Sequence, residues 1–338
     1  MTGLSDAFNR PINYLRISVT DRCNLRCTYC LPAEGTRLLP HSEILTYEEI
    51  ATIARLAAEL GINKLRLTGG EPLVRAKLTE LVAMLAKIST IDDISLTTNG
   101  ILLKDYASEL ARAGLKRVNI SLDSLRRDKF ERITRHRKLS EVLQGIEAAK
   151  ACGLSPVKIN MVVMRGINDD ELVDFANLTI AEGWHVRFIE LMPFATENPP
   201  EGHSTGGKTN LHPQFMPAQE ITRHLSSLGT LEPCLPIAGN GPAKYFRFPH
   251  ATGTIGFITP VSQHFCFNCN RLRLTAEGRL RPCLLSDEEV DLRQPLRDGA
   301  PPQELKQVIT EAIRRKPDKH HLSEGATTQK RHMSQVGG

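Results

Sequence analysis

Residues 14–30 read Tyr-Leu-Arg-Ile-Ser-Val-Thr-Asp-Arg-Cys-Asn-Leu-Arg-Cys-Thr-Tyr-Cys, a β-prone run that leads directly into three cysteines. Residues 14–19 are rich in aromatic and β-branched side chains, which predicts a strand. Cys23, Cys27 and Cys30 then fall on the loop that leaves this strand. In α/β barrels the loops at the carboxyl ends of the strands carry the active site. The stretch therefore predicts an α/β protein whose site begins with three thiols.

Five further β-rich runs follow, at residues 64–68, 94–98, 117–122, 157–163 and 186–189. Helical patterns lie between them, such as residues 48–60, where apolar positions share one face and Gly61 ends the helix. Six strand–helix alternations predict a parallel sheet with right-handed crossovers. The predicted fold class is α/β, an incomplete TIM-type barrel of about six βα units. A smaller C-terminal α+β region that binds a cluster completes it, and an open sheet fits the same periodicity.

The composition changes along the chain and predicts four parts. Residues 1–193 form the barrel core, and residues 194–217, dense in Pro, Gly, Asn, Thr and His, form an irregular connector. Residues 218–319 form the C-terminal region, with a helix at 218–228, strands near 245–248 and 254–258, a hairpin at 271–282 and a helix from Pro302 to about Arg315. Residues 320–338 are polar and basic and form a tail that ends in Gly-Gly.

Bulk properties exclude several classes of protein. No run of about 18 apolar residues predicts a transmembrane helix, and the N-terminus has no apolar signal segment. The formal net charge is +5, from 43 basic and 38 acidic residues, and aromatic residues make up 5% of the chain. This balance permits an anionic substrate but does not favour a base-stacking surface for nucleic acid. We therefore predict a cytoplasmic protein with no membrane or nucleic-acid partner, whose eight cysteines stay reduced.

The spacing of Cys23, Cys27 and Cys30 indicates an iron–sulfur site. Three thiolates on one loop can hold three irons of a [4Fe–4S] cluster and leave the fourth iron open to a small molecule. A structural zinc ion is the alternative, but zinc normally takes four ligands, and only His41 lies nearby. Gly69-Gly70-Glu71-Pro72 follows the second strand, where glycines allow close approach to a ligand and Glu71 can bond an ammonium group.

Cys266, Cys269 and Cys283 form a second set of three thiols. A zinc ion with His264 as fourth ligand, or less readily His250, is one interpretation, and a second [4Fe–4S] cluster with an open iron is the other. Arg271 and Arg273 lie on one face of the strand between these cysteines. Further cations occupy predicted core strands, where burial is costly unless they face an anion. These cations are Arg16, Lys64, Arg66, Lys158 and Arg187, and together they predict a bound triphosphate.

The cysteine spacing, with Tyr29 before the third cysteine and the Gly-Gly-Glu-Pro motif, resembles the radical S-adenosylmethionine (SAM) superfamily. The whole chain resembles the GTP 3′,8-cyclase family, from residues 14–23 and 96–100 through 118–125, 157–166, 186–193 and 265–275 to the terminal Met-Ser-Gln-Val-Gly-Gly. The resemblance implies two [4Fe–4S] clusters, SAM as cofactor and a lyase-type reaction. A 5′-deoxyadenosyl radical would abstract the ribose 3′-hydrogen of GTP, and the carbon radical would attack guanine C8.

The same resemblance implies roles for particular residues. The SAM contacts would be Tyr29, Gly70, Ser121 and Met192, with Glu71 in the motif that meets the methionyl amino group. The GTP contacts would be Arg16, Arg66, Thr97, Lys158, Arg271, Leu272 and Arg273. Arg187 is added as a substrate-binding candidate from the cationic strand positions. Gly337 and Gly338 would enter the active site and assist catalysis.

The resemblance also implies partners and leaves two alternatives. The product would open molybdenum cofactor biosynthesis and pass to cyclic pyranopterin monophosphate synthase, and the enzyme would need an electron donor and could form a homodimer. A radical SAM enzyme that modifies a peptide is one alternative, although such enzymes usually carry more C-terminal cysteines. A non-catalytic protein with two zinc sites is the other, but it leaves the Gly-Gly-Glu-Pro motif unexplained.

Overall fold

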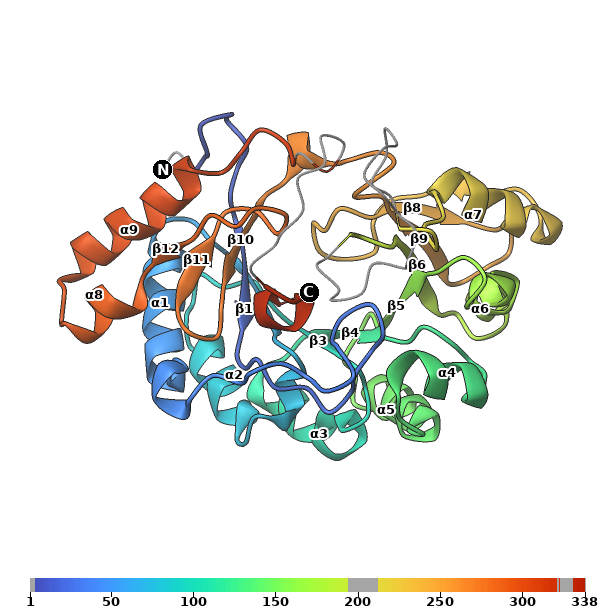
Figure 1. Cartoon of the computed structure of the whole chain (residues 1–338), viewed down its shortest axis with the longest axis horizontal. Helices are drawn as coiled ribbons and strands as arrows, with labels where there is room; N and C mark the ends of the chain where they lie inside the picture. Colours follow the sequence, from blue (N-terminus) through green and yellow to red (C-terminus); the bar gives the residue numbers. More distant parts are fainter. Residues whose placement is uncertain (1–3, 194–211, 321, 323–330, 338) are drawn as a thin grey trace.

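The computed structural model describes residues 4–193, 212–320, 322 and 331–337 (Figure 1). Most of the predicted connector at 194–217 therefore lies outside the described residues, as do Gly338 and much of the predicted tail. In the described part, no helix has both the length and the apolar character needed to cross a membrane.

All six predicted strands are present, with ends within one residue of the predicted ones. They pair side by side in sequence order, and every pair is parallel. The strands are β1 (Tyr14–Ser18), β2 (Lys64–Thr68), β3 (Asp93–Thr98), β4 (Arg117–Ser121), β5 (Lys158–Val163) and β6 (His185–Glu190).

Helices follow these strands and cover the outer face of the curved sheet (Figure 1). Helix α1 shows why its residues form a helix where they do: Thr46 Oγ1 accepts from Glu49 N at 3.1 Å, and Glu49 Oε2 accepts from Thr46 N at 2.7 Å, a reciprocal capping box. The helices are α1 (Tyr47–Glu59), α2 (Leu78–Ala86), α3 (Leu103–Ala113), α4 (Arg127–Thr134), α5 (Leu139–Ala151) and α6 (Leu172–Ala181).

The C-terminal region adds strands to both edges of this sheet. Strand β9 (Thr254–Ile258) pairs with β6, and β10 (Arg271–Leu274) pairs with β1, both in parallel. The described residues thus contain eight adjacent parallel strands, open between β9 and β10, which confirms the incomplete barrel. The remaining strands pair antiparallel outside these two, namely β7 (Glu232–Pro233), β8 (Lys244–Arg247), β11 (Arg279–Arg281) and β12 (Val290–Asp291).

Residues 259–270 have to cross the open side of the barrel, because they connect β9 at one edge to β10 at the other. Cys266 and Cys269 lie on this crossing. The four C-terminal helices are α7 (Ala218–Leu225), α8 (Arg293–Arg297), α9 (Pro302–Arg314) and α10 (Met333–Val336). The last of these lies in the hollow of the sheet, beside the C-terminus (Figure 1).

Alternation along the strands separates the core from the site. In β2, Leu65 and Leu67 are fully buried in the hydrophobic core beneath the helices, and Arg66 between them points to the concave side. In β10, Leu272 and Leu274 are likewise in the core, and Arg273 faces inward. The leucines stabilise the fold, whereas the intervening positions are available for function.

Candidate active site

The Gly-Gly-Glu-Pro motif holds the first cysteine loop in place. Gly70 N donates to Thr20 O at 2.9 Å, and Glu71 N donates to Arg22 O at 2.8 Å. A Cβ on Gly69 would lie 2.4 Å from Thr20 O, and one on Gly70 would lie 2.4 Å from Arg22 O. The glycines therefore allow two protein backbones to approach each other, which is a different use from the close contact with a ligand predicted from the sequence.

Gly70→Ala should displace the residue 20–23 backbone and lower the iron bound at the first cysteine set. The added methyl group would overlap a main-chain oxygen, which cannot swing away as a side-chain tip would. We expect a loss of stability of about 1–3 kcal/mol and reduced iron content after anaerobic reconstitution. Normal iron content in a folded variant would contradict this reading.

Glu71 lies beneath this loop with 1% of its surface exposed. Its carboxylate accepts from Leu73 N at 3.0 Å, Thr98 Oγ1 at 2.8 Å and Asn99 N at 2.6 Å. Burial raises its pKa to about 7, although these three donors oppose the shift. Glu71 thus joins the ends of β2 and β3, and its two oxygens are already engaged by the protein.

The three thiols of the first set lie close enough for their charges to interact. Burial raises the pKa of Cys23 to about 11 and that of Cys30 to about 12, and the Cys23 thiolate adds to the latter shift. For Cys27, burial is again the largest cause, and Asp123 and the two other thiols raise the pKa further. Three thiolates are therefore unstable here without a positive partner, and an iron–sulfur cluster supplies one.

The predicted SAM contacts surround this loop. Tyr29 donates its hydroxyl proton to Asp123 Oδ2 at 2.7 Å, and Asp123 Oδ1 accepts from Val162 N at 2.8 Å. Tyr29 and Met192 line a cavity beside the loop, and Met192 also lines the larger central cavity. Ser121 is the last residue of β4. Their positions are compatible with one ligand beside the first cysteine set.

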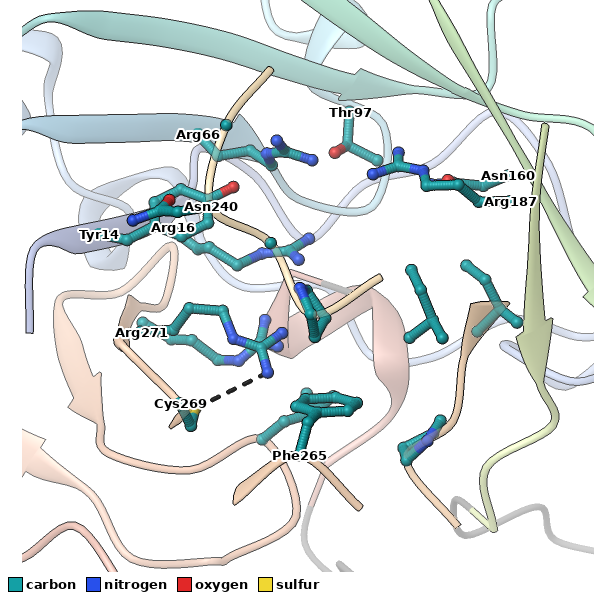
Figure 2. A pocket seen from close by; sticks show the side chains of 18 of the residues that line it. Tyr14, Arg16, Arg66, Thr97, Asn160, Arg187, Asn240, Phe265, Cys269 and Arg271 are labelled. Carbon is teal, nitrogen blue, oxygen red and sulfur yellow. Dashed lines mark hydrogen bonds between the residues drawn. The ribbon is translucent and has the colours of Figure 1, made fainter. Parts of the chain in front are cut away.

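The central cavity fills the hollow of the barrel, with an empty volume of about 1260 Å³ up to its open mouth. Seven of the eight predicted substrate-binding residues line it. They are Arg16, Arg66, Thr97, Lys158, Arg187, Arg271 and Arg273. Figure 2 shows Arg66, Thr97, Asn160 and Arg187 along one side and Arg271, Cys269 and Phe265 along another.

The cavity is strongly positive. Eight Arg and Lys residues line it, and no Asp or Glu appears among the described residues that do so. Burial, and then the charges of Arg187, Arg117 and Arg66, lower the pKa of Lys158 to about 6. Burial likewise lowers the pKa of Arg66 to about 10 and that of Arg273 to about 9. Such repulsion is relieved by a polyanionic ligand.

For two residues assigned to the substrate site from the sequence, the side chain does not line the cavity. Leu272 was predicted to contact GTP, but its side chain is 1% exposed and packs in the hydrophobic core, so that only its main chain remains available for such a contact. The prediction that Lys64 faces the bound anion is not supported either, because Lys64 does not line the cavity.

Sequence reasoning missed several polar residues of the cavity, among them Arg117, Asn160 and Lys316. Arg117 donates from Nε to Asp93 Oδ1 at 3.0 Å, and Asn160 Oδ1 is buried and has no hydrogen-bond partner within the described residues. Asn160 could have been found from strand alternation, since apolar residues flank it, whereas Arg117 follows Lys116 and lacks that signal. Lys316 follows α9 and has no such signal.

The second cysteine set lines the same cavity, so it faces the predicted substrate. Burial raises the pKa of Cys266, and the neighbouring thiolates Cys283 and Cys269 raise it further. Burial would also raise the pKa of Cys269, but the charges of Arg271 and Lys316 lower it to about 6. Arg271 Nη2 lies 3.7 Å from Cys269 Sγ (Figure 2).

Neither cysteine set converges on a single point. Across the described ranges, no group of three or more His, Cys, Asp or Glu side chains is arranged to hold one metal ion. A single zinc ion needs such convergence. A [4Fe–4S] cluster does not, because each thiolate binds a different iron atom.

The C-terminal tail reaches the first cysteine set and the central cavity. Arg331 pairs with Glu289 at 2.5 Å and with Glu277 at 2.5 Å, which fixes the start of the described segment. Cys30 lies within hydrogen-bonding reach of Ser334 N. Arg273 Nη1 donates to Gly337 O at 2.8 Å. The predicted entry of the tail into the site thus has direct contacts in support, up to Gly337.

The class of protein that this fold and site define is the radical SAM superfamily, whose family model matches residues 17–179. A second model, Molybdenum Cofactor Synthesis C, matches residues 184–322. With this class comes an iron–sulfur cluster and SAM as cofactors.

The particular family follows from full-length relatives. GTP 3′,8-cyclase of Pelotomaculum thermopropionicum is 54% identical over 336 residues, which cover 99% of this chain and 100% of that protein. GTP 3′,8-cyclase of Moorella thermoacetica is 53% identical over 335 residues, with 99% and 100% coverage. The chain belongs to the GTP 3′,8-cyclase family.

Solved structures agree on the fold. The anSMEcpe structure with bound AdoMet matches with a TM-score of 0.57 at 13% identity, over 94% of this chain and 84% of that one. Streptococcus suis SuiB bound to S-adenosylmethionine matches with a TM-score of 0.57 at 14% identity, over 84% of this chain. This chain spans 64% of the SuiB chain. At such identities the likeness concerns the fold alone.

Proposed function

We propose that this chain converts GTP to (8S)-3′,8-cyclo-7,8-dihydroguanosine 5′-triphosphate with release of methionine and 5′-deoxyadenosine, as a lyase that opens molybdenum cofactor biosynthesis. The observation that carries the proposal is the cavity itself: eight Arg and Lys side chains and no Asp or Glu are found among its described lining residues, which lie beside two cysteine sets. A triphosphate supplies the missing negative charge.

Cys23, Cys27 and Cys30 would hold the first [4Fe–4S] cluster, and Cys266, Cys269 and Cys283 would hold a second. When bound, the first cluster and SAM supply the radical that removes a hydrogen atom from the nucleotide. Tyr29, Gly70, Ser121 and Met192 would surround SAM. The second cluster is supported by three thiols that face the same cavity as the predicted substrate contacts.

The chain's own residues bind and orient the substrate. Arg16, Arg66 and Arg273 lie on neighbouring strands in register and can share the phosphates. Thr97 Oγ1 and Asn160 Oδ1 are buried without a hydrogen-bond partner in the described part, which leaves them available for hydroxyl or amino groups of the nucleotide. Residues 238–242 also line the cavity, and Lys158 Nζ donates to Ala238 O at 2.7 Å.

Anaerobic incubation with GTP, SAM and a reductant tests the proposal. We expect 5′-deoxyadenosine and a cyclised nucleotide in equal amounts. A protein that cannot bind GTP should form neither product. A protein that carries zinc in place of iron and sulfide, or one that cleaves SAM only in the presence of a peptide, would contradict it and favour one of the alternatives.

Binding of GTP should take up a proton at Lys158. Its pKa of about 6 in the free protein leaves the amine mostly neutral at pH 7.5, and nearby phosphate favours the charged form. The Lys158 contribution to affinity should therefore increase as pH falls from about 8 towards 6 and level off below that. Calorimetry in buffers of different ionisation enthalpy measures the uptake. Lys158→Met is the control, because it removes this uptake and leaves only the titration of the phosphate.

Partners and location stay predictions. The reaction needs an electron donor, and its product would pass to cyclic pyranopterin monophosphate synthase. The predicted location is cytoplasmic. A homodimer and the four-part domain division also stay predictions.

A further inference from the structure

Two buried cations contact the main chain beside each cysteine of the second set. Arg10 and Lys316 are 5% and 4% exposed, and they come from opposite ends of the sequence. Neither was among the predicted site residues. Both reach the loops that carry Cys266, Cys269 and Cys283.

Arg10 holds the Cys266 loop against the segment that follows Lys316. Its Nη1 donates to Cys266 O at 2.7 Å and to Asp318 O at 2.8 Å, and its Nη2 donates to Pro317 O at 2.6 Å. Its Nε pairs with Asp6 Oδ2 at 2.5 Å. Because Asp6 neutralises the charge of Arg10, this arginine fixes the position of the Cys266 loop and adds little to the electrostatic field at the cysteines.

Lys316 holds the other two cysteine positions. Its Nζ donates to Arg271 O at 2.8 Å and to Pro282 O at 2.6 Å, which lie two residues from Cys269 and one residue from Cys283. The Cys269 thiol is also within its hydrogen-bonding reach. No carboxylate pairs with Lys316 among the described residues, and the negative groups that act on it are the Cys269 and Cys283 thiolates.

These contacts matter because the three cysteines lie on connecting segments outside the strands of the sheet. Residues 259–270 cross the open side of the barrel, where no neighbouring strand can fix the main chain, and Cys283 follows β11 on a separate connection. Side-chain donors must replace the missing ladder bonds. Hydrogen bonds and charge around ligand sulfurs also set the potential of an iron–sulfur cluster.

We propose that Arg10 and Lys316 are positioning residues for the second cysteine set: Arg10 fixes the Cys266 loop, and Lys316 fixes the main chain beside Cys269 and Cys283 and stabilises the reduced, more negative state of the cluster bound there. The inference rests on the proposed second cluster. We assign Lys316 to the second cysteine set and not to the phosphates of the proposed substrate, because its Nζ donates to two carbonyl groups and lies within hydrogen-bonding reach of a thiol.

The test uses the full chain with Cys23→Ala, Cys27→Ala and Cys30→Ala, so that any iron retained after anaerobic reconstitution belongs to the second set. Iron and sulfide are measured per chain, and the ratio of reduced to oxidised cluster is read by electron paramagnetic resonance at one fixed solution potential and pH. Circular dichroism verifies folding. This background protein alone decides whether a second cluster exists.

Lys316→Gln keeps donors for the carbonyl groups and removes the charge. We expect parental iron content and a reduced-to-oxidised ratio about tenfold lower, which is about 59 mV for a one-electron couple. Lys316→Arg keeps the charge and should stay within about threefold of the parent. Arg10→Met should lose at least about half of the iron with little change in the ratio.

Arg75→Gln is the matched control, because Arg75 also donates to two main-chain carbonyls, Val19 O at 2.6 Å and Leu45 O at 2.7 Å, which do not adjoin the second set. It should leave both readouts unchanged. If the background protein binds iron but Lys316→Gln and Arg10→Met match it in content and ratio, the positioning role is overturned. If the background protein binds none, the second cluster is overturned, and this inference falls with it.

Discussion

Deletion of Gly337 and Gly338 should abolish cyclisation and leave the chain folded. Gly337 ends α10 with φ of 68° and presents its carbonyl oxygen to buried Arg273 at 2.8 Å. The residue before it, Val336, is 2% exposed and keeps the tail packed after the deletion. The loss concerns the position of a reacting group, so we expect a fall in cyclisation of about 100-fold or more. Product analysis and thermal unfolding measure the two effects.

Alanine substitutions separate a local effect on the tail from a general effect of altered backbone. A Cβ on Gly337 would lie 2.7 Å from Thr68 Cγ2. Gly299 has a similar φ of 78°, but a Cβ there meets nothing within 4 Å. Gly299→Ala should lower the free energy of unfolding by about 1 kcal/mol and leave cyclisation intact. Gly337→Ala should abolish cyclisation. Full activity of both the truncated protein and Gly337→Ala would refute a role of the tail in catalysis.

Replacement of Arg273 by methionine should weaken GTP binding by about 10- to 100-fold, because a charge-assisted hydrogen bond contributes about 1.5–3 kcal/mol. Arg273 lies between Arg16 and the tail, in a cavity without a lining carboxylate among the residues described. Its removal also relieves repulsion from Arg271, so the thermal stability of the free protein should not fall. Equilibrium binding of GTP under anaerobic conditions measures the affinity.

Arg271→Met is expected to have a smaller effect, since Arg271 also contacts Cys269 and the ring of Phe265. Arg279→Met is the matched control, because Arg279 lies on the next strand, is 38% exposed and pairs with Asp291. SAM cleavage should remain measurable in all three variants. Unchanged GTP affinity in both the Arg271 and Arg273 variants would remove these residues from the substrate site.

Much of the fold could be predicted because it depends on local pattern. Alternation of apolar and polar residues in β2 and β10 places leucines under the helices and arginines inside the barrel, and the printed sequence shows that alternation directly. The two cysteine sets and the cationic strand positions followed from spacing in the same way. The resemblance assigned a run of three residues that includes Leu272, whereas alternation turns the side chain of this middle residue outward into the core.

Long-range pairings could not be predicted in this way. Periodicity indicates that residues 254–258 and 271–274 are strands, but it does not say that they extend opposite edges of the barrel. The use of Gly69 and Gly70 to admit the residue 20–22 backbone also depends on which loops meet. Both features involve contacts between distant segments, which local pattern does not encode.

The sequence by itself thus determined the parallel α/β core, the six cysteines of the two sets and the excess of cations on core strands, because each depends on residue type and short spacing. Only the tertiary structure decided what these groups face. It placed Cys266 and Cys269 on the crossing between open barrel edges, brought Arg10 and Lys316 to the second cysteine set from opposite ends of the chain, and set Gly337 against Arg273. The physical reason is that burial, charge and hydrogen bonds act between neighbours in space, and neighbours in space are fixed by packing of the whole chain.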